Sequence, residues 1–276
     1  MRTLPFLRTV PPFPAVATKL MRLLASENAS FVEAARLLRS DSGLAAELLR
    51  VANSALFASR RVDTVLEALS LVGVERVNSL VITLSLCKLA ARASRTKSLG
   101  PCWRHNLACA TLAERLGRGF ALGSNSAHTA GLLHDIGRLA LLVADPVRYD
   151  DLLSNALTGG KDLLLRELDL FGVDHCQAGE MLVEEWGLPR QLAEVVGQHH
   201  QPHEKRSMGA LVHVACTMAD MLGFQAAGPD RPWNPNEIWD WVPHAAVMDW
   251  NPDELRFIVA EHINALECAD CAVAAA

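Results

Sequence analysis

Aromatic residues and runs of β-branched residues are both scarce in this sequence. Aromatic side chains make up 5% of the 276 residues, and Tyr149 is the one tyrosine. Leucine and alanine instead recur at spacings of three and four, which is the spacing of one helix face, so we predict an all-α protein. Because half of the residues are hydrophobic and 21% are charged, the chain can bury a large core.

An excess of positive charge and long hydrophobic runs are also missing. The formal net charge is -5 and the pI is about 6.1, whereas a protein that binds a duplex normally carries a basic face, so we expect no nucleic-acid partner. No stretch approaches the roughly 20 apolar residues of a membrane span, and the prolines of "MRTLPFLRTVPPFPAV" break any secretory signal. The seven cysteines are scattered and odd in number, which favours free thiols. We therefore expect a cytoplasmic protein without a membrane partner.

Capping residues and helix breakers predict short helices along the whole chain. Ser30 and Asp41 stand where N-caps belong, Gly73 separates two helices, and Asn251 is placed to cap the last one. The polar segment "SRTKSLGPC" is the best candidate for a junction. We predict a multi-helix bundle in three parts: an N-terminal helical part at residues 1–98, a helical bundle at residues 99–225, and a C-terminal helical appendage at residues 226–276. In the bundle we expect helices near residues 103–116, 124–143, 147–157, 161–171, 174–186, 189–200 and 208–222.

One of these helices carries polar groups that a core helix does not need. The segment "HTAGLLHDIGRLALLVAD", residues 128–145, is a hydrophobic run, yet it contains the adjacent pair His134 and Asp135 and then Gly137. Residues of the same two types recur near the ends of the neighbouring predicted helices: His105, His175, His199, His200 and Asp220. Imidazole and carboxylate together are ligands for Zn, Fe, Mn or Ni, and a bundle interior can bring them together. Adjacent residues of a helix point about 100° apart, so the pair can bind one metal, or Asp135 can bridge two.

The remaining histidines, cysteines and tryptophans have a plainer interpretation. Histidines without such a context are expected to be ordinary core or surface groups, with His213 the least secure because it lies two turns before Asp220: His128, His203, His213, His244 and His262. The pair Cys268 and Cys271 has the spacing of zinc or redox sites but lacks a second pair, so we assign it no site. The tryptophans at 233, 239, 241 and 250 are expected to attach the C-terminal appendage to the bundle, although an exposed binding surface is the alternative.

The order His, His-Asp, His, His-His, Asp resembles the HD superfamily of metal-dependent phosphohydrolases. Linked motifs over roughly residues 4–225 resemble, more narrowly, the HDOD (HD-related output domain) family: "LPFLRTVPPFPAVATKLMRLLAS", "LLRSDSGLAAELLRVANSALFAS", "VLEALSLVGVERVNSLV", "AGLLHDIGRLAL" and "FGVDHCQAGEMLVEEWGLPRQLAEVVGQHHQP". The resemblance implies an HD-like helical fold in which the basic ligand set is His105, His134, Asp135 and Asp220. His175 and the His199-His200 pair match the additional histidines of the two-metal HD-GYP branch.

The sequence departs from the HD-GYP branch in ways that bear on activity. His200 is followed by "QPHEKR" without the Gly-Tyr-Pro element, so hydrolysis of cyclic dinucleotides loses its best marker. Pro101 stands where a ligand to a third metal would be a glutamate, which argues against a trinuclear centre. Arg138 follows the His-Asp-x-Gly turn in place of lysine, and keeps a positive charge that can hold a phosphate.

Two functions follow from these residues. The first is a regulatory output protein of signal transduction, in which one or two divalent ions (Fe, Mn, Zn, Ni or Mg) have a structural or sensing role. The second is an active metal-dependent phosphohydrolase, in which Asp135 bridges the metals and Arg138 steadies a phosphate of a nucleotide or other phosphoester. The expected partner is a signalling protein in the first case and a phosphorylated small molecule in the second. We favour the first, because the HDOD motifs cover so much of the chain.

Overall fold

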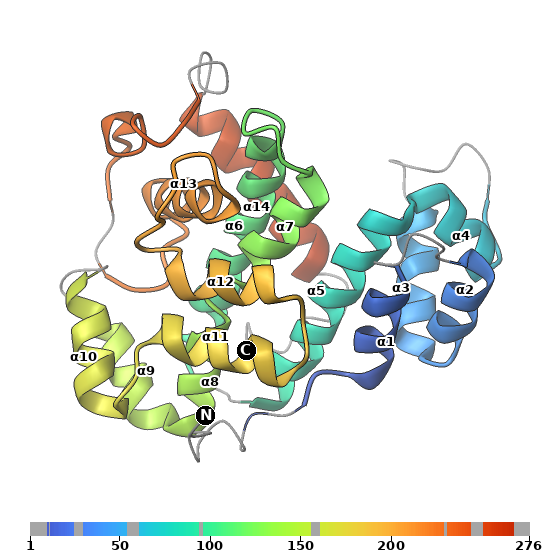
Figure 1. The fold of residues 1–276 in the computed structure, drawn as a ribbon, viewed down its shortest axis with the longest axis horizontal. Coiled ribbons are helices and arrows are strands. Elements are labelled where there is room, and N and C mark those ends of the chain that lie inside the picture. Colours follow the sequence, from blue (N-terminus) through green and yellow to red (C-terminus); the bar gives the residue numbers. More distant parts are fainter. Residues whose placement is uncertain are drawn as a thin grey trace. The chain divides into compact units, whose positions relative to one another are not determined.

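The chain folds into two compact helical units (Figure 1). The computed structural model describes residues 10, 12–24, 30–53, 61–93, 96–155, 161–228, 231–243 and 251–267, and contains no strand among them. One unit is Pro12–Leu89, and the other includes Ala90–Ala276. The prediction of an all-α fold is confirmed. No helix among the described residues is long and apolar enough to cross a membrane.

The smaller unit is a group of short capped helices. It contains α1 (Ala15–Leu24), α2 (Phe31–Arg39), α3 (Ser42–Ala52), α4 (Val65–Val72) and the first part of α5 (Val74–Ala93). Helix α2 packs against α1, α3 and α4. The predicted caps are present: Ser30 Oγ accepts from the Glu33 backbone N–H, and Asp41 Oδ1 accepts from the first turn of α3. Gly73 separates α4 from α5 with a φ of +86°, a conformation that favours glycine.

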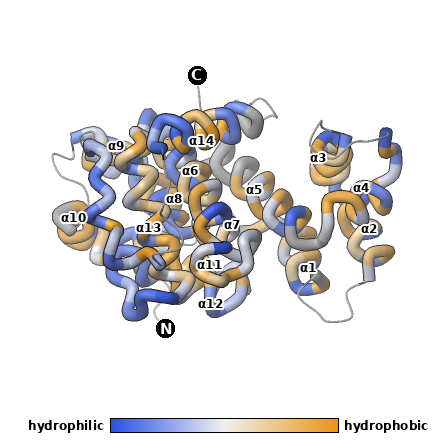
Figure 2. The backbone as a smooth tube through the Cα atoms, turned by 90° about the horizontal axis from the view of Figure 1, so that it is seen from above, coloured by the Kyte–Doolittle hydropathy of each residue, from blue (hydrophilic) through white to orange (hydrophobic). Residues whose placement is uncertain are grey.

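The larger unit is built around α6 (Leu99–Gly117), which packs against the helices α7 (Ser124–Leu133), α13 (Met208–Met221) and α14 (Pro252–Glu267). Helix α8 (Ile136–Ala144) packs against α9 (Pro146–Ser154) and α11 (His175–Glu185). Helix α12 (Arg190–Gln198) contacts α7, α11 and α13. Helix α10 (Lys161–Phe171) precedes α11. The hydrophobic stretches of α8 and α13 lie inside this unit (Figure 2). Most of the metal ligands that the sequence predicts are also buried in this core.

Two predicted helix boundaries in this unit are wrong. The continuous helix expected over residues 124–143 is two helices, α7 and α8, separated by a turn at His134 and Asp135. Asp135 has φ −103° and ψ 19°, a bridge conformation that does not continue a helix. Helix α6 begins at Leu99 rather than near residue 103, because Pro101 falls in the first turn, where the backbone N–H of a residue has no helical partner to lose.

The C-terminal segment is attached in part through an aromatic contact. The ring of Trp241 lies 5.3 Å from the ring of His213 on α13, as expected for a tryptophan that fastens this segment. Trp239, by contrast, keeps 46% of its surface exposed. Asn251 Oδ1 accepts from the backbone N–H groups of Asp253 and Glu254, as predicted for the cap of α14. Trp250, His244, Cys268 and Cys271 lie outside the described residues.

The burial of His128 leads us to expect that the stability of the protein depends on pH. It is buried on α7 with its ring 6.2 Å from that of His262, and burial together with the charge of His262 lowers its pKa from 6.5 to about 4. At a pH between these two pKa values, His128 is protonated in the unfolded chain and neutral in the folded chain. Stability therefore falls as the pH drops from 6.5 to about 4, by up to about 3 kcal/mol from this group.

The measurement is urea unfolding at a series of pH values in the native protein and in His128→Gln. Between pH 4 and 6.5 the free energy of unfolding is expected to change less with pH in the variant than in the native protein. Identical slopes in the two proteins would contradict the assignment.

Candidate metal centre

The turn between α7 and α8 places His134 and Asp135 at the centre of the larger unit. His105 reaches this point from α6, His175 from the first residue of α11, and His199 and His200 follow the last residue of α12. All of these side chains are buried except that of His200, which is partly exposed. The structure thus brings six of the seven predicted ligands together.

Two glycines allow the helices to meet closely on either side of this turn. A Cβ atom at Gly131 on α7 would lie 2.7 Å from the carbonyl oxygen of Cys109 on α6, and one at Gly137 on α8 would overlap the carbonyl oxygen of His175 on α11. The close approach of the α11 backbone explains why a glycine stands at position 137, because any side chain there would push His175 away.

Asp135 is the hub of the carboxylate-bearing part of the cluster. Its Oδ1 lies 3.1 Å from Nε2 of His175 and 3.3 Å from Nε2 of His199, and its Oδ2 accepts from Arg138 Nε at 2.5 Å. Burial by itself would raise the pKa of Asp135, but Arg138, His134 and His175 hold it well below its ordinary value. Asp135 is therefore ionised and able to bind a cation.

Four histidine rings are held by hydrogen bonds at Nδ1. The carbonyl oxygen of Phe224 accepts from His105 at 2.9 Å, and that of Gly131 accepts from His134 at 2.7 Å. The carbonyl oxygen of Val196 accepts from His199 at 2.8 Å. The Glu167 carboxylate accepts from His175 at 2.6 Å. Because carbonyls and carboxylates only accept, Nδ1 carries the hydrogen and Nε2 faces the cluster. Metal-binding histidines are oriented in this way.

Two pairs of Nε2 atoms face each other in the cluster. Nε2 of His105 lies 3.3 Å from that of His134, and Nε2 of His175 lies 3.1 Å from that of His200. Asp135 Oδ1 and His199 Nε2 are buried without a hydrogen-bond partner. Because Nδ1 carries the hydrogen in both His105 and His134, their Nε2 lone pairs face each other, and this pair calls for a cation between them, either a proton or a metal ion. The donor set therefore fits a divalent metal.

Arg138 and Asp220 differ from their expected positions. Arg138 is 6% exposed, bonded to Asp135 and 3.8 Å from Glu167, so its guanidinium faces the protein interior rather than a phosphate. Asp220 lies on the Nδ1 side of His105, at 3.5 Å, and 3.4 Å from Arg231. Burial raises the pKa of Asp220 to about 6. Its carboxylate falls outside the groups of donor atoms that lie close enough to share a metal.

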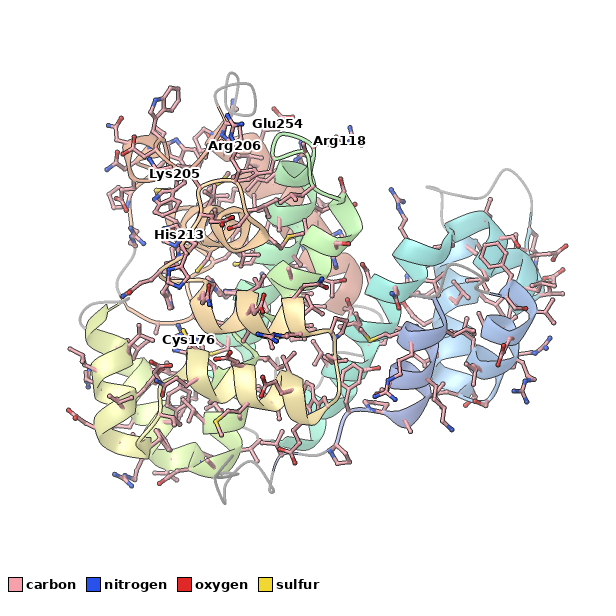
Figure 3. All side chains as sticks on the ribbon, viewed as in Figure 1. Arg118, Cys176, Lys205, Arg206, His213 and Glu254 are labelled. Atoms are coloured by element: carbon pink, nitrogen blue, oxygen red, sulfur yellow. The ribbon has the colours of Figure 1, made fainter. Side chains whose placement is uncertain are left out.

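The interpretation of the sequence missed three cysteines and a glutamate. Cys109 and Cys216 lie beside His105 and His134, and Cys176, which is labelled in Figure 3, lies with His175, His199 and His200. The signal was present: Cys109 comes one turn after His105, and Cys216 one turn before Asp220, on the same helix faces. Glu167 is buried, accepts from the Tyr149 hydroxyl at 2.7 Å, and orients His175; His175 and Arg138 lower its pKa to about 2 against the effect of burial.

Comparison with known proteins assigns the chain to a family. The profile of the HDOD domain matches residues 10–202, which is well over half of the chain. The chain belongs to the HDOD domain family. A protein from Treponema pallidum (strain Nichols) without an assigned function is 24% identical over 212 residues, which are 74% of this chain and 40% of that protein. The HDOD chain thus spans about two fifths of the length of the curated relative it matches.

Solved structures share the HDOD fold over nearly the whole chain. An HDOD domain protein with unknown function from Geobacter sulfurreducens has a TM-score of 0.68 at 20% identity, covering 98% of this chain and 96% of that one. A candidate phosphohydrolase from Shewanella amazonensis SB2B has a TM-score of 0.70 at 21% identity, covering 96% of both chains. A candidate signal transduction protein from Marinobacter aquaeolei VT8 has a TM-score of 0.66 at 21% identity, covering 97% of this chain and 59% of that one. At these identities the likeness concerns the fold.

Proposed function

We propose that this HDOD protein is a regulatory module of signal transduction that binds one or two divalent metal ions at the cluster around His134 and Asp135. The metal has a structural or sensing role, and the partner is a signalling protein. The six predicted ligands that meet there and the neighbouring cysteines supply more donor atoms than one ion needs.

The closure of the cluster is the observation that carries this proposal. A hydrolytic metal keeps an open coordination position for water and substrate, whereas structural sites are closed by protein ligands. Here His105, His134, Asp135, His175 and His199 are all buried. Arg138, the group best suited to hold a phosphate, is bonded to Asp135. Both features favour a metal that holds helices in place over one that activates water.

A second candidate, a metal-dependent phosphohydrolase, is favoured by a cleft beside α6. This cleft has a volume of about 530 Å³ and is lined by Lys97, Ser98 and Arg104 and by the segment that follows α13. Phe224, whose carbonyl orients His105, forms part of its wall. Two basic residues at a cleft next to a metal centre can hold a phosphoester. In such an enzyme the metal would supply hydroxide near neutral pH.

Metal analysis of the purified protein, paired with a panel of phosphoesters, tests the proposal. The native protein and the control His128→Gln, which alters a buried histidine outside the cluster, are expected to bind a divalent metal in stoichiometric amounts. The double variant His134→Ala/Asp135→Ala is expected to lose it. No phosphoester is expected to be hydrolysed faster by the native protein than by the double variant.

Two results would change the conclusion. Turnover that depends on metal and disappears in the double variant would replace the regulatory module with the phosphohydrolase. If the native protein binds no more metal than the double variant, both candidates fail.

A further inference from the structure

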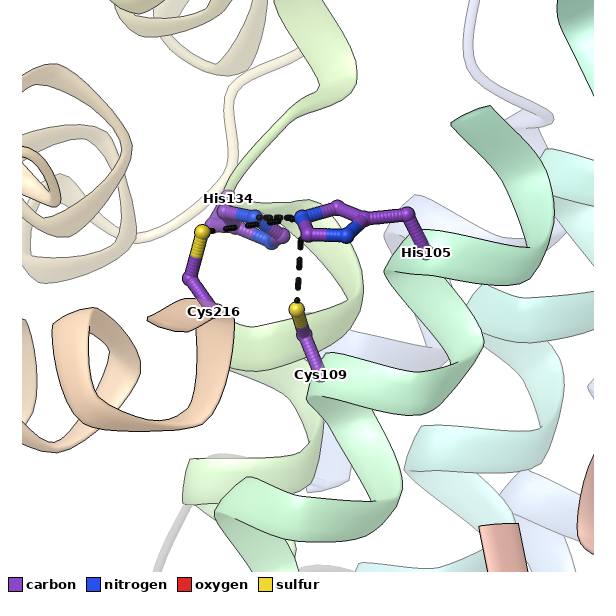
Figure 4. Close-up of side chains that lie close together, drawn as sticks. All are labelled: His105, Cys109, His134 and Cys216. Carbon is purple, nitrogen blue, oxygen red and sulfur yellow. Dashed lines mark hydrogen bonds between the residues drawn. The ribbon is translucent and has the colours of Figure 1, made fainter. Parts of the chain in front are cut away.

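A group of sulfur and nitrogen atoms lies on the α6 and α13 side of the turn. His105 and Cys109 are one turn apart on α6, His134 follows α7, and Cys216 lies on α13. Nε2 of His105 is 3.3 Å from Nε2 of His134, 3.5 Å from Cys109 Sγ and 3.6 Å from Cys216 Sγ (Figure 4). The four ligand atoms all lie within 4.8 Å of one another.

These distances match those of a tetrahedral zinc site. Zn–N bonds of about 2.0–2.1 Å and Zn–S bonds of about 2.3 Å, at tetrahedral angles, place two nitrogens about 3.3 Å apart and a nitrogen and a sulfur about 3.6 Å apart. The measured N···N distance is 3.3 Å, and the measured N···S distances are 3.5 and 3.6 Å. The three distances from His105 Nε2 are therefore those expected around a zinc ion.

The surroundings of the group also suit zinc. His105 and His134 donate from Nδ1 to the carbonyls of Phe224 and Gly131, which leaves both Nε2 atoms for the metal. Two thiolates and one Zn²⁺ have no net charge, so the ion can be buried without an uncompensated charge. None of the four residues exceeds 8% exposure. Such closure is typical of structural zinc, and a set of two sulfurs and two nitrogens selects zinc over the harder ions.

We propose that His105, Cys109, His134 and Cys216 bind zinc as a closed tetrahedral Cys2His2 site. It lies beside the group of His175, Cys176, His199 and His200, and it shares His134 with a third group that contains Asp135 and His199. This inference rests on the proposed metal centre and assigns a metal and a ligand set to one part of it. The zinc ties α6, the end of α7 and α13 together, so it acts on the fold of the unit rather than on a substrate.

X-ray absorption at the zinc edge of the full-length protein loaded with one equivalent of zinc tests the ligand set without any substitution. The expected result is two sulfurs at about 2.3 Å and two nitrogens at about 2.0–2.1 Å around each zinc. The neighbouring group of His175, Cys176, His199 and His200 offers a single sulfur. A first shell with one sulfur or none would therefore overturn the proposal.

Serine variants identify the sulfurs. Cys109→Ser and Cys216→Ser are each expected to weaken zinc binding at least about 100-fold in a chelator competition, because loss even of a residue that only orients a ligand weakens binding 10–100-fold. The matched control is Cys102→Ser, which removes a buried thiol of α6 outside the candidate metal groups and is expected to keep native zinc affinity. Loss of zinc in Cys176→Ser alone would place the metal in the group of His175, His199 and His200 and overturn the proposal.

The outcomes separate this inference from the proposed function. A protein that binds a divalent metal through nitrogen and oxygen alone has the metal centre but lacks the Cys2His2 site, so only the inference fails. A native protein that binds no metal lacks both. If a serine variant does not fold, as judged by circular dichroism, the sulfur count in the native protein decides.

Discussion

Replacing Arg138 by methionine is expected to lower the free energy of unfolding of the metal-free protein by about 3–5 kcal/mol. The Arg138 side chain is buried, donates from Nε to Asp135 Oδ2 at 2.5 Å, and lies 3.8 Å from Glu167. Without it, the Asp135 carboxylate stays buried with its main positive neighbour gone, and a buried charge that loses its partner is strongly unfavourable. Urea unfolding in the presence of a chelator measures the loss.

The exposed pair Arg148 and Asp145 provides the matched control for Arg138→Met. Their charged atoms are 3.6 Å apart and the Arg148 side chain is 60% exposed, so Arg148→Met is expected to change stability by less than about 1 kcal/mol. The double variant Arg138→Met/Asp135→Asn is expected to recover part of the lost stability, since it removes the unpaired charge. Equal effects of Arg138→Met and Arg148→Met would refute the buried ion pair.

Gly137→Ala is expected to destabilise the protein by more than about 3 kcal/mol and to weaken metal binding. The new methyl group would overlap the carbonyl oxygen of His175, and the backbone N–H of Gly179 on α11 is also within reach. Backbone atoms cannot rotate away as a flexible side chain can, so α8 and α11 must separate. The separation moves His175 away from Asp135. Thermal unfolding and metal content measure the two effects.

Gly209→Ala is the matched control for this substitution. Gly209 is likewise the second residue of a helix in the same unit, but the atoms nearest to an added Cβ there are 3.6 Å away. The change is expected to be neutral or to stabilise by up to about 1 kcal/mol, because alanine is the better helix former. A Gly137→Ala variant as stable as Gly209→Ala would show that α8 and α11 do not meet as described.

The sequence predicted most helices because their signals are local. Ser30, Asp41, Gly73 and Asn251 act through neighbours within a few residues, and each ends or begins a helix as expected. The break between α7 and α8 has no such signal. It depends on Asp135 turning towards histidines from other helices, and these contacts exist only in the folded unit.

The sequence predicts which histidines and aspartates are candidate ligands, but not which of them share one site with the cysteines. His105, His134, Asp135, His175, His199 and His200 meet, as their recurrence near helix ends suggested. Whether they bind metal stays a prediction. From the sequence, Cys109 and Cys216 are only two of seven scattered cysteines that are expected to be free thiols. Their spacing from His105 and Asp220 becomes informative only once α6 and α13 are known to pack together. Arg138 could not be assigned to the interior, because its partner Glu167 comes from a different helix.

The chain distance between the partners of the cluster has a consequence for folding kinetics. His105 and Cys216 meet across 111 residues, and His175 and His200 across 25. Closing the longer loop is slow, because chain entropy is lost before the contact is gained. During synthesis the group around His175 can assemble while α13 is still missing, but the group around Cys216 cannot. The half of the centre that contains Cys109 and Cys216 is therefore the last to form, and a chain that stops before α13 lacks it.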